Sequence, residues 1–240
     1  NGVDMIDAIW RFVVPIVICL ITTLIGGIVQ GIRRAKNGRR TNRDGLMAFE
    51  LWGGLPSDEM KRRIGELKSH GIKFEEIWID AGWYGNCTNC TDAFSGDWGV
   101  KTGDWFVNEK VHPGKLSDVA DCARDAGMNL MLWLEPERAV KGTEMENAHP
   151  EWFLDDGHGS MHKILWYGNP DAYNYIKETI AGYVRELKLS CYRQDFNVCL
   201  TDFFLHKDEE GRRGITEITH ITKMYELWDY LLSEFPGIII

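Results

Sequence analysis

Apolar and polar positions follow two different patterns on either side of about residue 45. Residues 12–32 form an uncharged apolar run, whereas the later chain alternates between short apolar runs and segments with apolar residues three or four positions apart. Short apolar runs bounded by glycine are typical of buried strands, and the wider spacing is typical of amphipathic helices. The pattern after residue 45 therefore predicts strands and helices in regular alternation.

Four strand–helix units and the opening of a fifth strand are predicted. The strands are expected within residues 46–54, 74–85, 128–137 and 189–197, with 237–240 as the opening of the fifth. The helices are expected within residues 57–71, 112–127, 169–188 and 216–237. This alternation indicates a parallel sheet with helical crossovers, built either as an open doubly wound sheet or as a (β/α)8 barrel.

Local signals predict where these helices begin and end and which side they bury. Ser57 and Asn169 are the expected N-caps, and Gly71 is expected to end the first helix. The last helix has apolar residues at helical spacing that are expected to face the core: Ile218, Ile221, Leu227 and Leu231.

Charged, amide and tryptophan side chains gather directly after the predicted strands. They are Trp52, Asp80, Trp83, Trp133, Glu135, Glu137, Arg193, Asp195 and Asn197. No G-x-G-x-x-G or G-x-x-x-x-G-K-[ST] motif follows any strand, so the nucleotide-binding sheets lose support. Barrel enzymes build their sites at the C-terminal ends of the strands, and flat indole faces stack on sugar rings. The arrangement favours a barrel with a sugar site, although a single tryptophan is more often a core residue.

The net charge and the cysteine content argue against certain partners and cofactors. The 240 residues include 27 Lys and Arg against 36 Asp and Glu, a net charge of -9, which argues against nucleic-acid binding. Of the six cysteines, only Cys87 and Cys90 form a C-x-x-C pair. A disulfide scaffold is not favoured, and a zinc site would need His158 and His162 from a Gly-rich loop to complete it. No metal or other cofactor is expected.

The apolar run at residues 12–32 is long enough to cross a membrane. At about 1.5 Å per residue it spans the roughly 30 Å hydrocarbon core. The basic residues that follow it place this side in the cytoplasm by the positive-inside rule; they are Arg33, Arg34, Lys36, Arg39, Arg40 and Arg43. We expect a flank at 1–11, a transmembrane helix at 12–32, a basic linker at 33–45 and a cytoplasmic catalytic domain at 46–240. The alternative is a core helix or an unrelated leader, without a membrane anchor.

Asp195 is placed to act as an ionised carboxylate at a strand end. Glycosidases usually use two carboxyl groups, one as proton donor and the other as nucleophile or base. Arg193 lies two positions earlier and so points to the same side of the strand, where its charge favours the ionised carboxylate. Asn197 would follow on that side. The alternative is an Asp195 that only caps the next helix or pairs with Arg193.

The acids after the second and third strands also have two interpretations. Glu135 and Glu137 flank a proline, and they either take part in catalysis or end the strand with an ion pair to Arg138. Asp80 either contacts a substrate or serves as a loop acid. The spacing alone leaves both alternatives open.

Several stretches taken together resemble family 36 of the glycoside hydrolases, the melibiase-type α-galactosidases. They are WIDAGWYG, GDW, NEKVHPGKLSDVADCARDAGMNLMLWLEPERAV, HPEWFL, and YRQDFN followed by GITEI, in the family's order over residues 46–240. The resemblance implies a partial (β/α)8 TIM barrel: the first four βα units and the start of strand five, behind the N-terminal hydrophobic helix. It also implies removal of terminal α-linked galactose with retention of configuration and without a cofactor.

The resemblance assigns roles to residues of this chain. Asp195 corresponds to the nucleophile that forms a covalent galactosyl intermediate. Six more residues correspond to a ring-hydroxyl-binding aspartate, a lining tryptophan, a basic residue with a following asparagine, and two pocket-wall tryptophans. In that order they are Asp80, Trp133, Arg193, Asn197, Trp83 and Trp98. Many members carry a second aspartate where this chain has Ala81, so one hydroxyl contact is missing or supplied differently.

The family's general acid/base has no counterpart among these residues. In the family it lies near the end of strand six, whereas the sequence ends at Ile240. We expect a truncated chain, inactive by itself, whose exposed strand edge allows an oligomer. Three functions stay open: a retaining α-galactosidase or a relative acting on α-N-acetylgalactosamine, a non-catalytic membrane-anchored sugar-binding remnant, and a transglycosylase. The expected partner is an α-galactoside oligosaccharide.

Overall fold

The computed structural model describes residues 46–240. The expected flank at 1–11, transmembrane helix at 12–32 and basic linker at 33–45 lie outside the described residues. Within residues 46–240, every helix is too short or too polar to span a bilayer.

The main sheet has four parallel strands in the order in which they occur along the chain. They are β1 (Ala48–Leu51), β2 (Glu76–Ile79), β3 (Asn129–Leu134) and β7 (Cys191–Gln194). Beyond β7, Ile239 forms a parallel bridge with Cys191, and its N–H donates to the Ser190 carbonyl at 2.9 Å. The four expected strands and the opening of a fifth are therefore confirmed.

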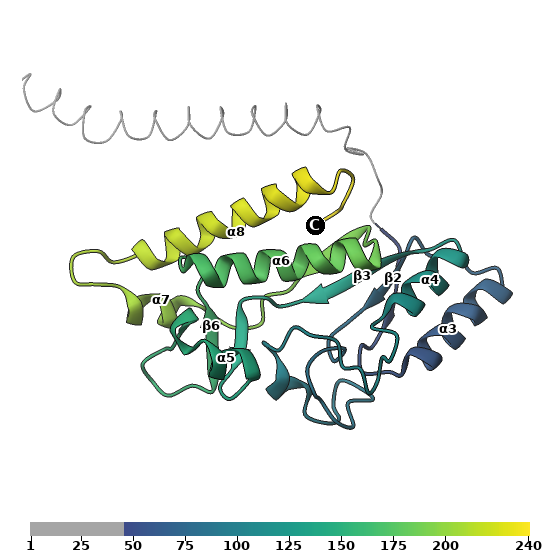
Figure 1. Ribbon diagram of the computed structural model, residues 1–240, viewed down its shortest axis with the longest axis horizontal. Coiled ribbons are helices and arrows are strands. Elements are labelled where there is room, and N and C mark those ends of the chain that lie inside the picture. The colour runs from purple at the N-terminus through teal and green to yellow at the C-terminus, as the bar shows by residue number, and fades with distance from the viewer. Residues whose placement is uncertain (1–45) are drawn as a thin grey trace, which may run out of the picture. The chain divides into compact units, whose positions relative to one another are not determined.

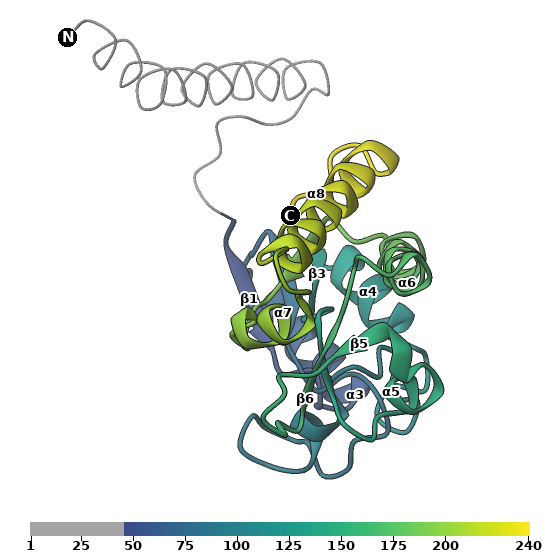
Figure 2. The same cartoon turned by 90° about the vertical axis from the view of Figure 1, so that its left-hand side faces the viewer.

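A long helix follows each of these strands. They are α3 (Ser57–Ser69), α4 (Ser117–Asp125), α6 (Pro170–Leu187) and α8 (Ile215–Glu234), and Figures 1 and 2 show α6 and α8 side by side. Strand residues such as Leu51, Ile77 and Leu132 are fully buried in one core with apolar helix residues such as Ile64 and Ile180. Because side chains alternate along a strand, the intervening residues point to the opposite face of the sheet.

Two of the three expected helix boundaries are confirmed. The Asn169 side chain caps α6, accepting from the backbone N–H groups of Asp171 at 2.9 Å and Ala172 at 3.3 Å. Gly71 follows α3 with a φ of 68°, the left-handed conformation that glycine adopts readily. The prediction for Ser57 is wrong, because Pro56 is the N-cap and the Ser57 hydroxyl lies 3.0 Å from His112 Nδ1 instead.

Leu227 and Leu231 of the last helix are buried and Ile221 packs against the core, as predicted, whereas Ile218 does not. Ile218, expected to face the core, is 58% exposed. Near the start of the helix the inner side carries polar residues instead, and His220 Nε2 lies 2.8 Å from Glu137 Oε1 there. The residues of α8 that the core buries are Thr216, His220, Met224, Leu227 and Leu231.

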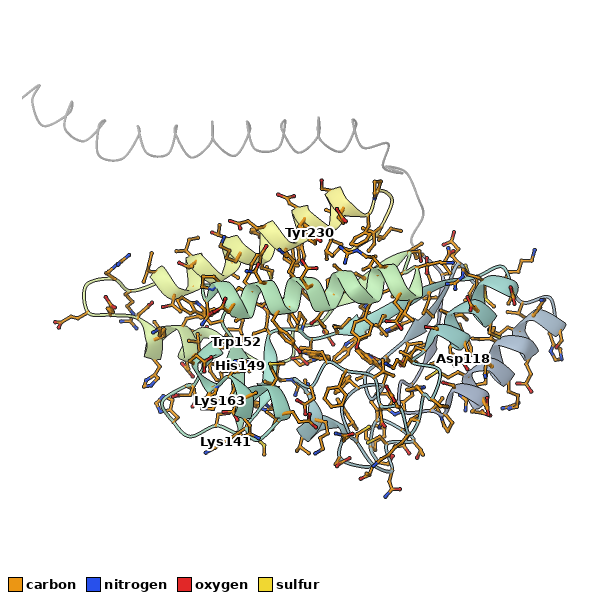
Figure 3. All side chains as sticks on the ribbon, viewed as in Figure 1. Asp118, Lys141, His149, Trp152, Lys163 and Tyr230 are labelled. Carbon is orange, nitrogen blue, oxygen red and sulfur yellow. The ribbon has the colours of Figure 1, made fainter. Side chains whose placement is uncertain are left out.

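A second, smaller sheet lies in the segment between β3 and α6 and was not predicted. Its antiparallel strands are β4 (Arg138–Val140), β5 (Phe153–Leu154) and β6 (His162–Leu165), in the order β4-β6-β5. The short helices α5 (Glu144–Ala148) and η3 (Pro150–Trp152) join β4 to β5, and the rings of His149 and Trp152 stack there at 3.9 Å (Figure 3). Two further short helices are η2 (Trp98–Lys101) and α7 (Thr201–Lys207).

Candidate active site

The face of the main sheet opposite the helices carries the polar residues. Trp133 on β3 pairs in register with Arg193 on β7, so both project from the same face. The ladder continues one residue further, because the Asp195 N–H donates to the Leu134 carbonyl at 2.9 Å. Asp195 thus stands at the C-terminal end of its strand, on the side where the sequence predicts the site.

Asp195 is surrounded by hydrogen-bond donors. Its Oδ2 accepts from Trp133 Nε1 and from Asn197 Nδ2, each at 2.9 Å, and its Oδ1 accepts from the Phe196 N–H at 2.9 Å. Partial burial is the largest single influence and would raise the pKa of Asp195, but these donors and the Arg193 charge together outweigh it and lower that pKa. The carboxylate is therefore held in its ionised form.

Arg193 occupies a different part of the same face. Its guanidinium lies over the Trp78 ring, 4.2 Å from the ring centroid, in a cation–π contact. It therefore reaches from β7 across β3 to β2. Arg193 acts on Asp195 through its charge, while the hydrogen bonds to that carboxylate come from other groups. The interpretation of Asp195 as a helix cap also fails, because α7 begins at Thr201 with Leu200 as its N-cap.

A second acidic group lies at the ends of β1 and β2. Asp80 follows β2, and its Oδ1 accepts from the Ala81 N–H at 2.8 Å. The carboxyl of Glu50 is its hydrogen-bonding neighbour. Partial burial first, and then the hydrogen bond and charge of Asp80, raise the pKa of Glu50, whereas Arg193 lowers it. These two acids lie side by side on adjacent strands, and the nearby Asp80 carboxyl makes the charged form of Glu50 less favourable.

Close backbone packing holds the Asp80 loop in place. The Gly53 N–H donates to the Ala81 carbonyl at 2.9 Å. A Cβ added at Gly53 would lie 2.2 Å from the Asp80 carbonyl oxygen, so only glycine fits at this crossing. Ala81 itself points into the core and is 4% exposed. The Ala81 side chain offers no polar group at the position where the family resemblance would place a second aspartate. Glu50 is the second carboxyl beside Asp80.

The two tryptophans expected as pocket walls differ in their surroundings. Trp83 is fully buried, and its Nε1 donates to the Trp133 carbonyl at 3.0 Å. It therefore has no surface to offer a sugar, and the structure places it as a support behind Trp133. Trp98 is half-buried in η2 and packs edge-on against Trp52, with ring centroids 5.2 Å apart. The Trp52 Nε1 in turn donates to the Cys90 carbonyl at 2.8 Å.

The two glutamates of the LEPER stretch are both buried but have different partners. Glu135 forms the expected ion pair with Arg138, with Nη2 and Oε2 2.7 Å apart. It also accepts from the Asn197 N–H at 2.9 Å and from Asn197 Nδ2 at 3.1 Å, contacts that the sequence did not predict. Glu137 instead meets His220 on α8.

Sequence reasoning missed two residues of this face although a usable signal was present. Trp78 lies two positions before Asp80, and Glu50 lies two positions before Trp52. The period-two rule that relates Arg193 to Asp195 applies equally to these pairs. Glu50 and Trp78 pair in register on β1 and β2, so both belong to the face that carries Asp80.

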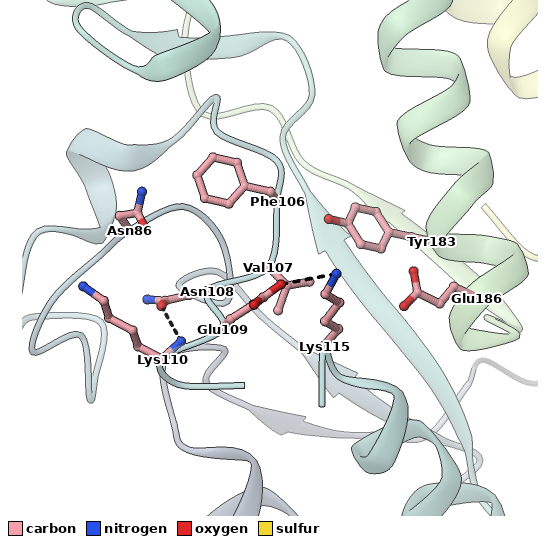
Figure 4. Close-up of a pocket in the computed structure, with 9 residues that line it drawn as sticks. All are labelled: Asn86, Phe106, Val107, Asn108, Glu109, Lys110, Lys115, Tyr183 and Glu186. Carbon is pink, nitrogen blue, oxygen red and sulfur yellow. Dashed lines mark hydrogen bonds and ion pairs between the residues drawn. The ribbon is translucent and has the colours of Figure 1, made fainter. Parts of the chain in front are cut away.

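One pocket of about 400 Å³ lies among other residues (Figure 4). It includes none of the sequence-predicted site residues, and Lys115 and Glu109 form an ion pair 3.2 Å long within it. Its lining residues are Asn86, Phe106, Val107, Asn108, Glu109, Lys110, Lys115, Tyr183 and Glu186. Among residues 46–240, no group of three or more His, Cys, Asp or Glu side chains is arranged to hold a metal ion.

A parallel α/β sheet with an ionised aspartate, an arginine and tryptophans at its strand ends is typical of enzymes that act on carbohydrates. The Melibiase family model matches residues 47–240, and the chain belongs to this family. It is 26% identical over 213 residues to α-galactosidase AgaA of Geobacillus stearothermophilus, covering 86% of this chain and 28% of that protein.

Solved structures of relatives share the fold. The GH36 α-galactosidase AgaB of Geobacillus stearothermophilus has a TM-score of 0.68 at 24% identity, covering 82% of this chain and 27% of that one. A variant of AgaA in complex with stachyose has a TM-score of 0.68 at 23% identity over the same shares. The chain thus spans about a quarter of the length of the relatives that it matches.

Proposed function

We propose that this chain contributes to a retaining α-galactosidase, in which Asp195 attacks the anomeric carbon of a terminal α-linked galactose and forms a covalent galactosyl-aspartate. The observation that carries the proposal is the ionised Asp195 carboxylate with its donors from Trp133, Asn197 and Phe196. A carboxylate nucleophile must be charged before it can attack, and these donors favour that state. The Melibiase family membership supports the same chemistry.

We propose further that the four strand–helix units are the first half of a (β/α)8 barrel. The strands follow one another in chain order, and the Ile239 bridge opens a fifth position beyond β7. In a barrel the face opposite the helices becomes the interior, and the C-terminal strand ends form the mouth of the site. Side chains from β1, β2, β3 and β7 would then converge on one sugar ring.

The sugar-binding groups in this proposal lie between the two acidic positions. Asp80 and Glu50 offer carboxyl oxygens to ring hydroxyls, and Arg193 offers a cationic donor between them and Asp195. Adjacent strands lie about 4.8 Å apart, so groups on β1 and β2 would contact hydroxyls on the side of the ring remote from the reacting carbon. Trp133 is 3% exposed and would border the ring with the Nε1 edge that donates to Asp195, Trp83 would hold Trp133, and Trp98 would wall the pocket with Trp52.

The proposed substrate class is α-galactoside oligosaccharides. AgaA variants have been solved in complex with stachyose and with raffinose, which supports this choice for a family member. Two other functions of the same residues are a sugar-binding protein without turnover and a transglycosylase that passes galactose to another sugar.

The test is hydrolysis of an aryl α-galactoside by the intact protein, with proton NMR of the sugar first released. The proposal expects α-galactose to appear before it equilibrates with the β anomer. Initial release of β-galactose would contradict a covalent intermediate. Galactose binding without turnover would support the sugar-binding function, and a high ratio of transfer to hydrolysis with added acceptor sugar would support the transglycosylase.

A further inference from the structure

The Glu135 carboxylate is buried and takes no direct part in the proposed chemistry. It is 1% exposed and lies just past the end of β3. A buried charge is costly unless it is paired and hydrogen-bonded. Glu135 has three such partners: the Arg138 guanidinium at 2.7 Å, the Asn197 N–H at 2.9 Å and Asn197 Nδ2 at 3.1 Å.

The Asn197 side chain connects this buried acid to Asp195. Its Nδ2 carries two hydrogens, and two carboxylate oxygens lie within reach: Glu135 Oε2 at 3.1 Å and Asp195 Oδ2 at 2.9 Å. An ionised carboxylate only accepts hydrogen bonds, whereas an amide offers donors on nitrogen and an acceptor on oxygen. Both contacts can therefore form together only while the nitrogen faces the two acids.

We propose that Glu135, with its charge balanced by Arg138, is a positioning residue that sets the orientation of the Asn197 amide so that it donates to Asp195. This inference rests on the proposed role of Asp195 as nucleophile. Without the Glu135 acceptor, Asn197 loses the partner of its backbone N–H and one of the two acids that hold its Nδ2, so its donor to Asp195 Oδ2 is no longer fixed in place. The effect of Glu135 on the reaction thus passes through one rotatable amide.

The mechanism makes a specific kinetic prediction. The donors around Asp195 lower its pKa, so removing one of them raises that pKa. The reaction needs ionised Asp195, and activity is lost as the pH falls through its pKa. Loss of the Asn197 donor should therefore move the acid limb of the kcat/KM profile to higher pH.

The first experiment uses Glu135→Gln in the intact protein with an activated aryl α-galactoside, whose leaving group departs without a proton donor. Glutamine keeps the size of the side chain but can donate as well as accept. We expect kcat to fall roughly 10- to 100-fold with little change in KM, because the nucleophile is misplaced while sugar binding remains. The acid limb should move to higher pH. An unmoved acid limb in the folded variant would overturn the inference.

The neighbouring glutamate provides a matched control. Glu137 belongs to the same LEPER stretch, is 3% exposed, and accepts from His220 Nε2 rather than from Asn197. Glu137→Gln should alter thermal stability but leave the acid limb where it is. If both variants move the acid limb equally, the effect comes from general loosening of the loop and the proposal fails.

A double-variant comparison tests the route through Asn197. Asn197→Ala should move the acid limb in the same direction, and adding Glu135→Gln should cost less than about 2-fold more, since the two changes remove one contact. If the fold-loss of the double variant equals the product of the two single losses, Glu135 acts by a route other than Asn197. Should Glu135→Gln fail to fold, Asn197→Ala alone decides, because an unchanged acid limb in that variant contradicts the proposal. Asp195→Asn distinguishes failure of the proposed function from failure of the inference about Glu135. Retained turnover in Asp195→Asn refutes the proposed function itself, whatever the Glu135 variants show.

Discussion

Two acidic regions on the same face of the sheet have opposite electrostatics. At the end of β7, Asp195 accepts from three donors and its pKa is lowered. At the ends of β1 and β2, partial burial and then the neighbouring Asp80 carboxyl raise the pKa of Glu50. Carboxyl groups at the ends of different strands of one sheet therefore have different electrostatics according to their partners. In the proposed function, Asp195 attacks as an anion, and Asp80 and Glu50 contact sugar hydroxyls.

Arg193 lies between these regions and belongs to both. Its guanidinium stacks on Trp78, on the strand next to Glu50, while its backbone lies two residues before Asp195. Its charge lowers the pKa of Glu50 and also that of Asp195. The contrast between the regions therefore comes from local hydrogen bonds, because the positive charge acts on both in the same direction.

The largest expected effect follows from changing Asp195. Asp195→Asn removes the nucleophile but preserves the size of the side chain, and kcat on an aryl α-galactoside should fall by roughly 10⁴-fold or more. Galactose binding, measured by calorimetry, should change little because Asp80 and Arg193 remain. Turnover within 10-fold of wild type would refute the role of Asp195.

The charge shared by both regions can be removed with Arg193→Met. We expect kcat/KM to fall roughly 10- to 100-fold, the range for losing hydrogen bonds from a charged group. The acid limb should also move to higher pH, since the Arg193 charge lowers the pKa of Asp195. A loss in kcat/KM without any movement of the acid limb would separate Arg193 from Asp195 and weaken the account of their shared field.

A donor to Asp195 can be removed with Trp133→Phe, which keeps an aromatic ring. The Nε1 contact at 2.9 Å is lost, so kcat should fall about 10-fold and the acid limb should move to higher pH. Steady-state kinetics between pH 4 and pH 8 measure both effects. The indole contact is irrelevant to ionisation if the acid limb coincides with that of wild type.

The other region can be changed with Glu50→Gln, which preserves size and exposure. Galactose binding should weaken roughly 3- to 10-fold, the range for one neutral hydrogen bond, while the acid limb of turnover stays unchanged. Glu210→Gln, an exposed change in the loop between α7 and α8, serves as the control. Equal effects of the two variants on binding would remove Glu50 from the sugar site.

The smallest expected effect is on stability. The pKa of Glu50 is raised in the folded state, so its contribution to the free energy of unfolding is present at low pH and declines as the pH rises through the raised pKa. Glu50→Gln lacks this decline. Urea unfolding should therefore give similar midpoints for wild type and Glu50→Gln at pH 4. At pH 7 the midpoint of Glu50→Gln should be higher relative to that of wild type. If the difference between the two midpoints stays the same from pH 4 to pH 7, or shifts in favour of the wild type, the raised pKa of Glu50 is contradicted.

The regular part of the fold could be predicted because its signals are local. Apolar runs of β2 and β3 and the helical spacing of Met60, Ile64 and Leu67 need only neighbouring residues. The small antiparallel sheet escaped prediction because β4 and β5 have only three and two residues, too few to show a pattern, and β6 begins with the polar His162 and Lys163. The exposure of Ile218 was not predicted because the inner side of α8 carries His220, whose contact with Glu137 no local pattern contains.

The part of the site that lies on one segment could also be predicted from local signals. The period-two rule and the family resemblance found Asp195, Arg193 and Asn197 on one strand. The partners of Asp195 come from β3, and the bond between Asn197 and Glu135 joins segments 62 residues apart. Trp83 was expected as a wall because its position in the sequence does not reveal that it is fully buried behind Trp133. Contacts across strands required the structure.

The most direct test of the central claim is to trap the intermediate. The intact protein would be treated with an activated fluorinated α-galactosyl fluoride, which forms the glycosyl-enzyme readily but releases it slowly, and then digested for mass spectrometry. The account predicts one fluorogalactosyl unit on the peptide that contains Asp195, and none on the Asp195→Asn variant. A label on any other carboxylate, or turnover of aryl α-galactosides with no labelled peptide, would contradict it.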